Sequence, residues 1–516
     1  MTAVAAPPPT RAPRLDPDGI YGALADLTRP CMIVRTAAGI GATNSTALNG
    51  GTLLAAAAPA PPERFGDPAF LRAHGVRQAY MAGAMAGGIA SADLVIALAR
   101  AGLLGSFGAA GLLPDRTEQA LLRFQREIPG LPYCCNLIHS PSEEALERAT
   151  VDLYLRHRVR SVEAAAYLDL TPHIVRYRAA GLARGRDGAT TVANRVMAKV
   201  SRAEVADRFL RPPPDALLAP LAAAGLITAE QAALARTVPV ADDITAEADS
   251  GGHTDRRSLT TLLPALLRLR DVRAPAVRVG AAGGIGDPYG VAAAFAMGAD
   301  YVVTGSVNQC CTEAGTSAAA KAMLAEAGVA DCEMAPAADM FEMGVQVQVL
   351  KKACFFPVRA AQLHQIYMTY PGIEAIPADV RRRLETQTFQ RPLAEVWADT
   401  VRYFEERDPA QIERALDDPK RRMALIFRWY LGMASRWATS GRPDRTVDYQ
   451  LWCGPAMGAF NDWVRGSSLE PPAARQAAVI AHHLMTGAAF LNRVAQLRLA
   501  GVRLPPRVTT YRLPKP

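Results

Sequence analysis

The sequence predicts an α/β protein whose main part is a (β/α)8 barrel, followed by a mainly helical C-terminal region. Between residues 78 and 328, a short apolar run precedes an amphipathic helical run eight times, and eight strand–helix units close a barrel. Several of these runs end in Gly or Ser, which lets a backbone lie close to a ligand. Beyond about residue 340 the alternation stops, and all five Trp lie there. An open doubly wound sheet ranks second because such a sheet usually has fewer units.

The N-terminal part precedes the repeating pattern. Residues 1–14 are rich in Ala and Pro and are expected to form a disordered tail. Residues 15–64 form a lead-in, with a strand expected at 31–35 and a linker in the Ala/Pro run 55–62. The barrel is expected to span residues 65–344. Its strands are predicted at 78–84, 103–109, 133–138, 161–167, 195–200, 243–249, 277–283 and 301–306.

Two segments depart from the strand–helix alternation. Residues 211–240 add a Pro cluster and a helical insertion between the fifth and sixth strands, and we expect them to help shape the mouth of the site. Residues 345–516 form the helical C-terminal region, which is expected to pack on the barrel, with its aromatic side chains in the core. Its helices are predicted at 378–386, 392–406, 409–436 and 471–498.

Composition narrows the classes of function. The net charge is +8, but no basic run carries interleaved aromatic residues, so nucleic-acid binding is not expected. The eight Cys form no C-x-x-C motif, which indicates neither a zinc site nor a disulfide framework and fits reduced thiols in a cytoplasmic protein. No run of about 18 apolar residues predicts a membrane span, and the N-terminus lacks the pattern of a secretory signal.

Small residues follow the seventh and eighth strands, at the end of a barrel where its chemistry lies. Gly283 and Gly284 follow the seventh strand, and Gly305 and Ser306 follow the eighth. In a (β/α)8 barrel these two loops often hold a phosphate group through backbone N–H groups and a helix N-terminus. The alternative is that these glycines only turn the chain.

His253 is a candidate for proton transfer. It follows Gly251 and Gly252 at the end of the sixth strand, a position suited to proton transfer or to hydrogen bonding of a carbonyl group. Asn136, at the end of the third strand, is a candidate amide partner for a ligand ring. A packing role would explain Asn136 equally well.

Lys199 is a candidate for charge stabilisation. It lies in the fifth strand of a chain that otherwise prefers Arg, and a Lys that points into a barrel must meet an anion or a carboxylate. A ligand phosphate or an electron-rich ring would serve. An ion pair with Glu163 or Glu247 from nearby strands is the alternative.

Longer stretches of the sequence resemble known families. The chain contains MAGAMAGGIASADLVIALARAGLLGSFGAAG, EADSGGHTD, AAGGIGDP and MGADYVVTGS. They resemble the FMN-dependent nitronate monooxygenase and 2-nitropropane dioxygenase-like superfamily, which includes flavin-dependent enoyl-acyl carrier protein reductases. It also contains KVSRAEVADRFLRP, EMGVQVQVLKKACFFPVRA, ALIFRWYLG and DYQLWCGPAMGAFNDW. These more specifically resemble the PfaD family, and the resemblance runs from about residue 17 to about residue 490.

The resemblance implies a barrel that binds FMN non-covalently; no metal site is expected. The residues that would line the flavin are Gly83, Ala84, Met85 and Ala86. Those that would contact its ring, ribityl chain or phosphate are Asn136, Lys199, Gly251, Gly252, Gly283, Gly284, Gly305 and Ser306. Ser250 stands where simpler relatives often have Ala, which leaves the shape of the pocket open.

The implied activity is that of a trans-acting enoyl reductase. Such enzymes use NAD(P)H and flavin to reduce the 2,3 double bond of an enoyl thioester on an acyl carrier protein, in polyunsaturated fatty acid or polyketide biosynthesis. His253 matches the active-site histidine of the superfamily and would act on the thioester oxygen or supply the proton. Lys199 would stabilise negative charge on the reduced flavin.

The implied partners are the acyl carrier protein domains of a fatty acid or polyketide synthase. Such domains tend to be acidic, and the arginines at 381–383 and 421–422 form a hypothetical docking site. A homodimer is left open. Two other functions remain: a nitronate monooxygenase with the same cofactor and fold, which the long Trp-rich C-terminal region argues against, and a non-catalytic scaffold of a synthase.

Overall fold

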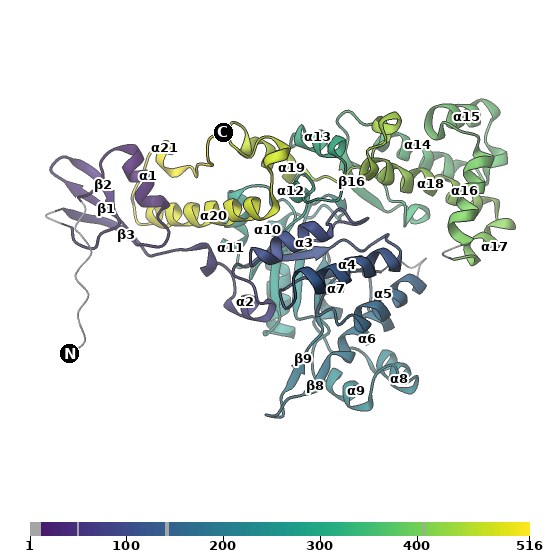
Figure 1. The fold of residues 1–516 in the computed structure, drawn as a ribbon, viewed down its shortest axis with the longest axis horizontal. Coiled ribbons are helices and arrows are strands. Elements are labelled where there is room, and N and C mark those ends of the chain that lie inside the picture. The colour runs from purple at the N-terminus through teal and green to yellow at the C-terminus, as the bar shows by residue number, and fades with distance from the viewer. Residues whose placement is uncertain (1–11, 49–50, 140–143, 406–407) are drawn as a thin grey trace.

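The chain folds around a closed barrel of eight parallel strands, in the order β10-β11-β13-β14-β4-β5-β6-β7. This computed structural model describes residues 12–48, 51–139, 144–405 and 408–516. The barrel strands are β4 (Tyr80–Ala82), β5 (Leu104–Phe107), β6 (Cys134–Ile138), β7 (Ser161–Ala165), β10 (Arg195–Val200), β11 (Asp243–Glu247), β13 (Arg278–Ala282) and β14 (Val302–Thr304). Each lies within a range predicted from the sequence, so the (β/α)8 barrel is confirmed (Figure 1).

Helices cover the outside of the barrel. They are α3 (Ala92–Arg100), α4 (Pro114–Glu127), α5 (Glu144–Arg156), α6 (Pro172–Ala180), α7 (Ala203–Phe209), α10 (Leu259–Arg273), α11 (Pro288–Ala296), α12 (Ser306–Gln309) and α13 (Ala318–Ala325). Strands of a parallel barrel are buried on both faces, which is why their sequences are apolar runs rather than alternating patterns. Strand β7, for example, is buried along its whole length.

Helix α2 (Pro68–His74) fills the amino end of the barrel. Its Phe70 ring stacks on Tyr301, with ring centres 4.4 Å apart. His74 Nε2 lies 2.9 Å from one carboxylate oxygen of Asp243, and Arg278 donates to the other at 2.6 Å. Burial raises the pKa of Asp243, but His74 and Arg278 outweigh burial and hold that pKa below its usual value. The filled amino end leaves the carboxyl end of the barrel for a ligand.

The helical insertion lies far from the carboxyl end of the barrel. Helix α7 returns the chain to the amino end of the strands before α8 (Asp215–Ala223) and α9 (Ala229–Ala235) form. These helices pack on α6 and on the hairpin of β8 (Leu182–Arg184) and β9 (Thr190–Val192) (Figure 1). No residue of 211–240 lines the cavity described below. The expectation that this insertion shapes the mouth of the site is therefore wrong, because the insertion follows a helix rather than a strand.

The N-terminal residues form a small antiparallel sheet. Its strands are β1 (Cys31–Thr36), β2 (Gly39–Thr43) and β3 (Thr52–Ala57), in the order β2-β1-β3, beside α1 (Pro17–Ala25). Strand β3 takes up part of the run expected as a linker. Residues 1–11 of the expected tail lie outside the described residues, but Arg14 pairs with Ala42 and belongs to the fold. This sheet packs against the last long helix of the chain (Figure 1).

The C-terminal region is mainly helical, as the sequence predicts. Its helices are α14 (Phe356–Thr369), α15 (Ala378–Arg383), α16 (Leu393–Glu405), α17 (Ala410–Leu416), α18 (Pro419–Ser440), α19 (Pro455–Val464), α20 (Ala477–Leu499) and α21 (Pro506–Thr509), with a π-helix at Leu384–Phe389. The helix predicted at 409–436 is two helices. Asp418 caps α18 by accepting from the N–H of Arg421 at 3.0 Å, and Pro419 begins it, since Pro fits only the first turn of a helix.

A three-stranded sheet joins the barrel to the C-terminal region. It consists of β12 (Gly252–His253), β16 (Gln346–Leu350) and β15 (Cys332–Pro336), in that order. Short 3-10 helices occur at Pro62–Arg64, Phe341–Met343, Ile373–Ala375, Pro443–Asp448 and Pro472–Ala474. Within the described part of the chain, no helix has both the length and the apolar character that crossing a membrane requires.

Candidate active site

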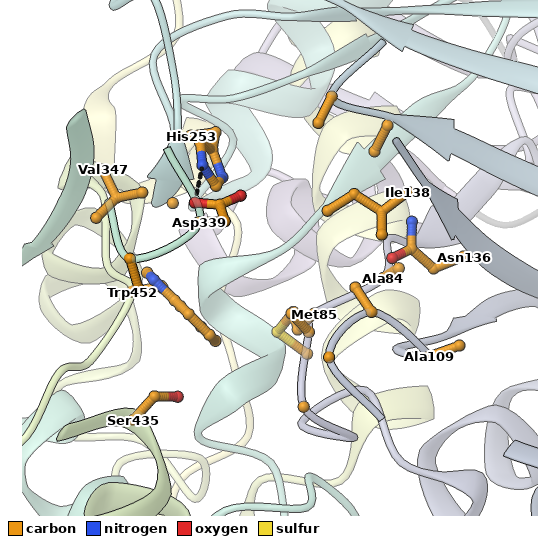
Figure 2. A pocket seen from close by; sticks show the side chains of 18 of the residues that line it. Ala84, Met85, Ala109, Asn136, Ile138, His253, Asp339, Val347, Ser435 and Trp452 are labelled. Atoms are coloured by element: carbon orange, nitrogen blue, oxygen red, sulfur yellow. Dashed lines mark hydrogen bonds and ion pairs between the residues drawn. The ribbon is translucent and has the colours of Figure 1, made fainter. Parts of the chain in front are cut away.

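A cavity of about 920 Å³ opens at the carboxyl ends of the barrel strands. Its volume is near the upper end of the range for ligand pockets, roughly 300–1,000 Å³. Figure 2 shows Asn136, Ala84 and Met85 on one side of this space and His253 and Trp452 on the other. All the site residues named from the sequence line the cavity: Gly83, Ala84, Met85, Ala86, Asn136, Lys199, Gly251, Gly252, His253, Gly283, Gly284, Gly305 and Ser306.

Lys199 lies between two carboxylates in the barrel. Its Nζ is 3.2 Å from Glu247 Oε1 and 3.7 Å from Glu163 Oε1. Burial disfavours the charged ammonium, but the charges of Glu247 and Glu163 outweigh burial and raise the pKa of Lys199 above its usual value. The ion pair considered from the sequence is therefore present, and Lys199 carries a positive charge at the wall of the cavity. Its contact with a ligand stays a prediction.

Glu163 connects this cation to the first loop of the barrel. Its second carboxylate oxygen accepts from the backbone N–H of Ala84 at 2.8 Å, and its backbone carbonyl accepts from the side-chain amide of Asn136 at 3.1 Å. The backbone of Gly108 also packs directly against this loop. A Cβ added at Gly108 would lie 1.8 Å from the carbonyl oxygen of Met85, so only Gly fits there. These contacts hold the backbone of Ala84 and Met85, which lines the cavity.

The loops after β13 and β14 form an open cradle of backbone N–H groups. Gly283 and Gly284 have φ of 85° and 70°, and residues other than Gly rarely adopt such backbone conformations. A Cβ added at Gly284 or Gly305 would meet no atom within 4 Å. Within the described residues, the N–H groups of Gly284, Gly305 and Ser306 have no hydrogen-bond partner in the protein. Such a set of donors suits an anion such as phosphate.

His253 faces the cavity from strand β12. Its Nε2 lies 3.1 Å from Asp339 Oδ1, and the imidazole side chain is 37% exposed. Burial lowers the pKa of His253, but the hydrogen bond and charge of Asp339 outweigh burial and raise it above the usual value. Burial likewise raises the pKa of Asp339, and His253 brings it below its usual value. The pair therefore favours a protonated imidazole next to a carboxylate.

Several cavity residues escaped the sequence reasoning. Asp339 is separated from His253 by 86 residues, and nothing in the local sequence marks it. Trp452 was expected in the core, but it lines the cavity on the same side as His253 (Figure 2). Gly108, which lies under Met85 and outside the cavity lining, carried a weak signal, since it follows the second barrel strand as Gly283 follows the seventh. The face of α18 that lines the cavity belongs to a helix whose packing was not predictable.

The arginine clusters proposed for docking lie outside the cavity lining. Arg422 pairs with Glu374, with Nη2 2.5 Å from Oε1, and Arg421 donates to the side chain of Gln411 at 2.6 Å. Arg383 pairs with Asp379 at 3.2 Å. Docking at these clusters stays a hypothesis, and it would require these contacts to rearrange.

Residues 73–388, more than half of the chain, match the nitronate monooxygenase family. The chain belongs to this family. Residues 11–60 match the N-terminal domain of the fatty acid synthase subunit PfaD. Residues 370–449 match the inserted helical domain of [acyl-carrier-protein] S-malonyltransferase. The first two matches confirm the resemblance stated from the sequence; the third was not anticipated.

Curated relatives of this family member include polyunsaturated fatty acid synthase subunits and polyketide biosynthesis proteins. The chain is 49% identical over 446 residues to a polyunsaturated fatty acid synthase subunit of Thraustochytrium, covering 84% of this chain and 30% of that protein. It is 47% identical over 447 residues to the polyketide biosynthesis protein ThaF of Burkholderia thailandensis, covering 85% and 38%. The chain thus spans less than two thirds of the length of these relatives.

The chain also matches the whole length of a solved domain structure. The enoyl reductase domain of MlnA, from the macrolactin biosynthesis cluster of Bacillus amyloliquefaciens, superposes with a TM-score of 0.80 at 39% sequence identity. The match covers 86% of this chain and 100% of that domain. The barrel and the helical C-terminal region are therefore shared with that reductase domain.

Proposed function

We propose that the chain is an FMN-dependent enoyl reductase that uses NAD(P)H to reduce the 2,3 double bond of enoyl thioesters on acyl carrier proteins. The observation that carries this proposal is the structural match to a whole enoyl reductase domain, which covers 86% of this chain. The relatives from polyunsaturated fatty acid and polyketide synthases support a carrier-bound substrate. Carrier domains of such a synthase are the partners that we propose.

The cavity fits FMN. The N–H groups of Gly284, Gly305 and Ser306 would hold its phosphate, and the loop at Ala84 and Met85 would lie against its ring. Asn136 would add an amide contact. Bound FMN would supply hydride transfer from a nicotinamide to the β-carbon of the enoyl thioester.

Two charged side chains of the cavity have complementary tasks in this proposal. Lys199 holds a positive charge at the cavity wall, and Glu163 and Glu247 keep it protonated. Lys199 therefore stabilises negative charge that builds up beside it. His253, protonated through Asp339, donates to the thioester oxygen, where charge develops, and is a source of the proton that the α-carbon takes.

An absorbance spectrum of the purified protein tests the proposal. The protein is titrated under anaerobic conditions with NADPH or NADH, and then with a crotonyl thioester. We expect a flavin spectrum that bleaches with the nicotinamide and recovers with the thioester. Extraction and mass measurement of the bound flavin would distinguish FMN from FAD.

The family match to nitronate monooxygenases supports a second candidate function. In that case the flavin would ignore the thioester, and it would be reoxidised when a nitronate and air are added. A protein that binds no flavin, even after reconstitution with FMN, would instead act as a non-catalytic part of a synthase. The same titration therefore separates the three functions.

A further inference from the structure

One face of helix α18 forms a wall of the cavity. The residues of α18 that line the cavity follow one another in steps of three and four along the helix, which is the spacing of one helix face. They are Leu425, Arg428, Trp429, Gly432, Met433, Ser435, Arg436 and Thr439. Figure 2 shows Ser435 together with Trp452 on the side opposite Ala84 and Asn136. The cavity therefore extends beyond the barrel to a helix of the C-terminal region.

Gly432 leaves open space in the middle of this wall. A glycine inside a helix weakens it relative to alanine, so such a glycine calls for a reason. Its backbone is helical, and a Cβ added there would meet no atom within 4 Å. Neither a left-handed conformation nor close packing requires this glycine. What its missing side chain does is widen the cavity along α18.

The polar groups next to Gly432 suit a chain with amides and a terminal phosphate. Ser435 and Thr439 bring hydroxyl groups to the wall. Arg436 is exposed, and among the described residues it has no carboxylate partner; its guanidinium lies 5.5 Å from the centre of the Tyr403 ring. Arg428, at the other end of the row, is already paired with Glu342, with Nη1 3.4 Å from Oε1. Arg436 is therefore the cation of this row that is available to an incoming anion.

We propose that the pantetheine arm of the thioester substrate lies along α18, with Gly432 making room for the arm and Arg436 binding its phosphate. This assignment rests on the proposed function, because it takes a carrier-bound thioester as the substrate. Gly432 and Arg436 then determine specificity for the arm, whereas His253 and Lys199 act at the reacting end.

Three thioesters with the same crotonyl group test the assignment. They are crotonyl-N-acetylcysteamine, which keeps only the reactive end of the arm, crotonyl-pantetheine, and crotonyl-phosphopantetheine. In Gly432→Leu we expect KM to rise at least tenfold for the two substrates with the whole arm and less than threefold for the truncated one. In Arg436→Gln we expect a comparable rise only for the substrate that carries the phosphate.

A matched control is the same substitution at another glycine inside a helix. Gly22 in α1 also has a helical backbone with no atom within 4 Å of an added Cβ, and it lies outside the cavity lining. Gly22→Leu should therefore leave all three KM values as in the unmodified protein. NADPH is varied in the same assays, because its phosphate is a second possible ligand of Arg436.

The outcomes are distinct. Equal effects of Gly432→Leu on all three thioesters would overturn the assignment of the arm to α18. So would a rise in KM for a long-chain 2-enoyl-N-acetylcysteamine without one for crotonyl-phosphopantetheine, which would place the acyl tail there. A change of the KM for NADPH alone in Arg436→Gln would assign Arg436 to the nicotinamide cofactor. If the unmodified protein reduces none of the thioesters, the proposed function itself has failed.

Discussion

His253 is held in its protonated form by Asp339. The pKa of His253 is raised because the hydrogen bond and charge of Asp339 outweigh burial. The rate of thioester reduction should therefore fall as the pH rises through this raised pKa. The same shift favours the folded state at pH below the unfolded pKa of His, near 6.5, and this contribution to stability is lost as the pH rises through the folded pKa.

The Asp339→Asn variant tests this coupling. Loss of the carboxylate should lower the pKa of His253, so the fall in kcat should move to lower pH, while the flavin spectrum stays unchanged. A His253→Gln variant should lose the pH dependence and about 100-fold in kcat, which is a typical contribution of a general acid. An Asp339→Asn variant with an unaltered pH profile would show that another group titrates.

Lys199 shows how far a single residue could be interpreted from the sequence. Its position in a strand predicted that it meets an anion, and the ion pair with Glu163 and Glu247 is present. The partner of His253 could not be predicted in this way. Asp339 lies in the loop between β15 and β16, and the pairing of β16 with the two-residue strand β12 brings this loop to His253. A strand of two residues is too short to give a recognisable pattern in the sequence.

A Lys199→Met variant should be less stable. Removing the ammonium leaves two carboxylates facing each other in a mostly buried place, and breaking one partner of such a pair typically costs about 3–5 kcal/mol. Urea unfolding followed by circular dichroism measures the change in the free energy of unfolding. Lys199→Arg, which keeps a positive charge, is the control and should lose less. A change under about 1 kcal/mol in Lys199→Met would mean that the carboxylates are solvated.

At the scale of the elements, two glycines of α18 and its C-cap have opposite roles. Gly432 sits in the helix interior, whereas Gly441 caps its end with φ of 72°, and a Cβ there would lie 3.0 Å from Ser317. Gly432→Ala should raise the free energy of unfolding by about 1 kcal/mol. Gly441→Ala should lower it by about 1 kcal/mol or more, because Ala resists the left-handed conformation.

Thermal and urea unfolding of both variants check this pair of predictions. If Gly432→Ala is more stable but also has a higher KM for the thioester with the complete arm, then the glycine of the unmodified protein lowers the stability of the helix and in return keeps the cavity wide. Destabilisation by Gly432→Ala would instead indicate a neighbour that leaves no room for the added methyl group.

The barrel strands and the helical insertion at 211–240 were predictable as elements, but the end of the barrel at which the insertion lies was not. Each barrel strand lies in a short, mainly apolar run, and several of these runs end in small residues; this pattern is local, as in 301–306. The direction in which an inserted segment packs depends on whether it follows a strand or a helix. Residues 211–240 follow α7, so they lie at the amino end of the barrel. The split of 409–436 at Pro419 was visible in the sequence, because Pro begins helices and interrupts their interior.

At the scale of the whole molecule, the first and last parts of the chain fold together. The apolar side chains of α1 and of the N-terminal sheet form one buried cluster with Phe490, Leu491 and Val494 of α20. Contacts between segments more than 400 residues apart leave no local pattern in the sequence. The sequence therefore predicted a lead-in at residues 15–64 but not the helix on which it packs. The N-terminal unit is thus a support for α20, which in turn packs on α11 and α3 of the barrel.

Arg493 fastens this unit to α20. Its guanidinium is buried and donates to five backbone carbonyl groups at 2.7–3.4 Å, those of Leu24, Asp26, Leu27, Arg29 and Ala58. An Arg493→Leu variant would remove a donor from all five carbonyl groups. Leu27 would still accept from the N–H of Ala60 at 2.9 Å, but the buried carbonyl of Leu24 would lose its Arg493 donor, and a buried acceptor left without a donor costs about 1–3 kcal/mol. We expect the loss, about 3 kcal/mol or more, to appear first as local opening of the N-terminal unit.

Limited proteolysis with thermolysin measures this opening. In Arg493→Leu the chain should be cut near residues 60–66 at least tenfold faster than in the unmodified protein, and the N-terminal fragment should separate on gel filtration. The control is Arg498→Leu on the same helix. Arg498 is exposed, and within the described residues its guanidinium makes one hydrogen bond, to Thr509 at 3.4 Å. Equal cleavage in both variants would mean that apolar packing alone holds the unit. The cavity is lined by none of these residues, so the flavin spectrum should be the same in all three proteins.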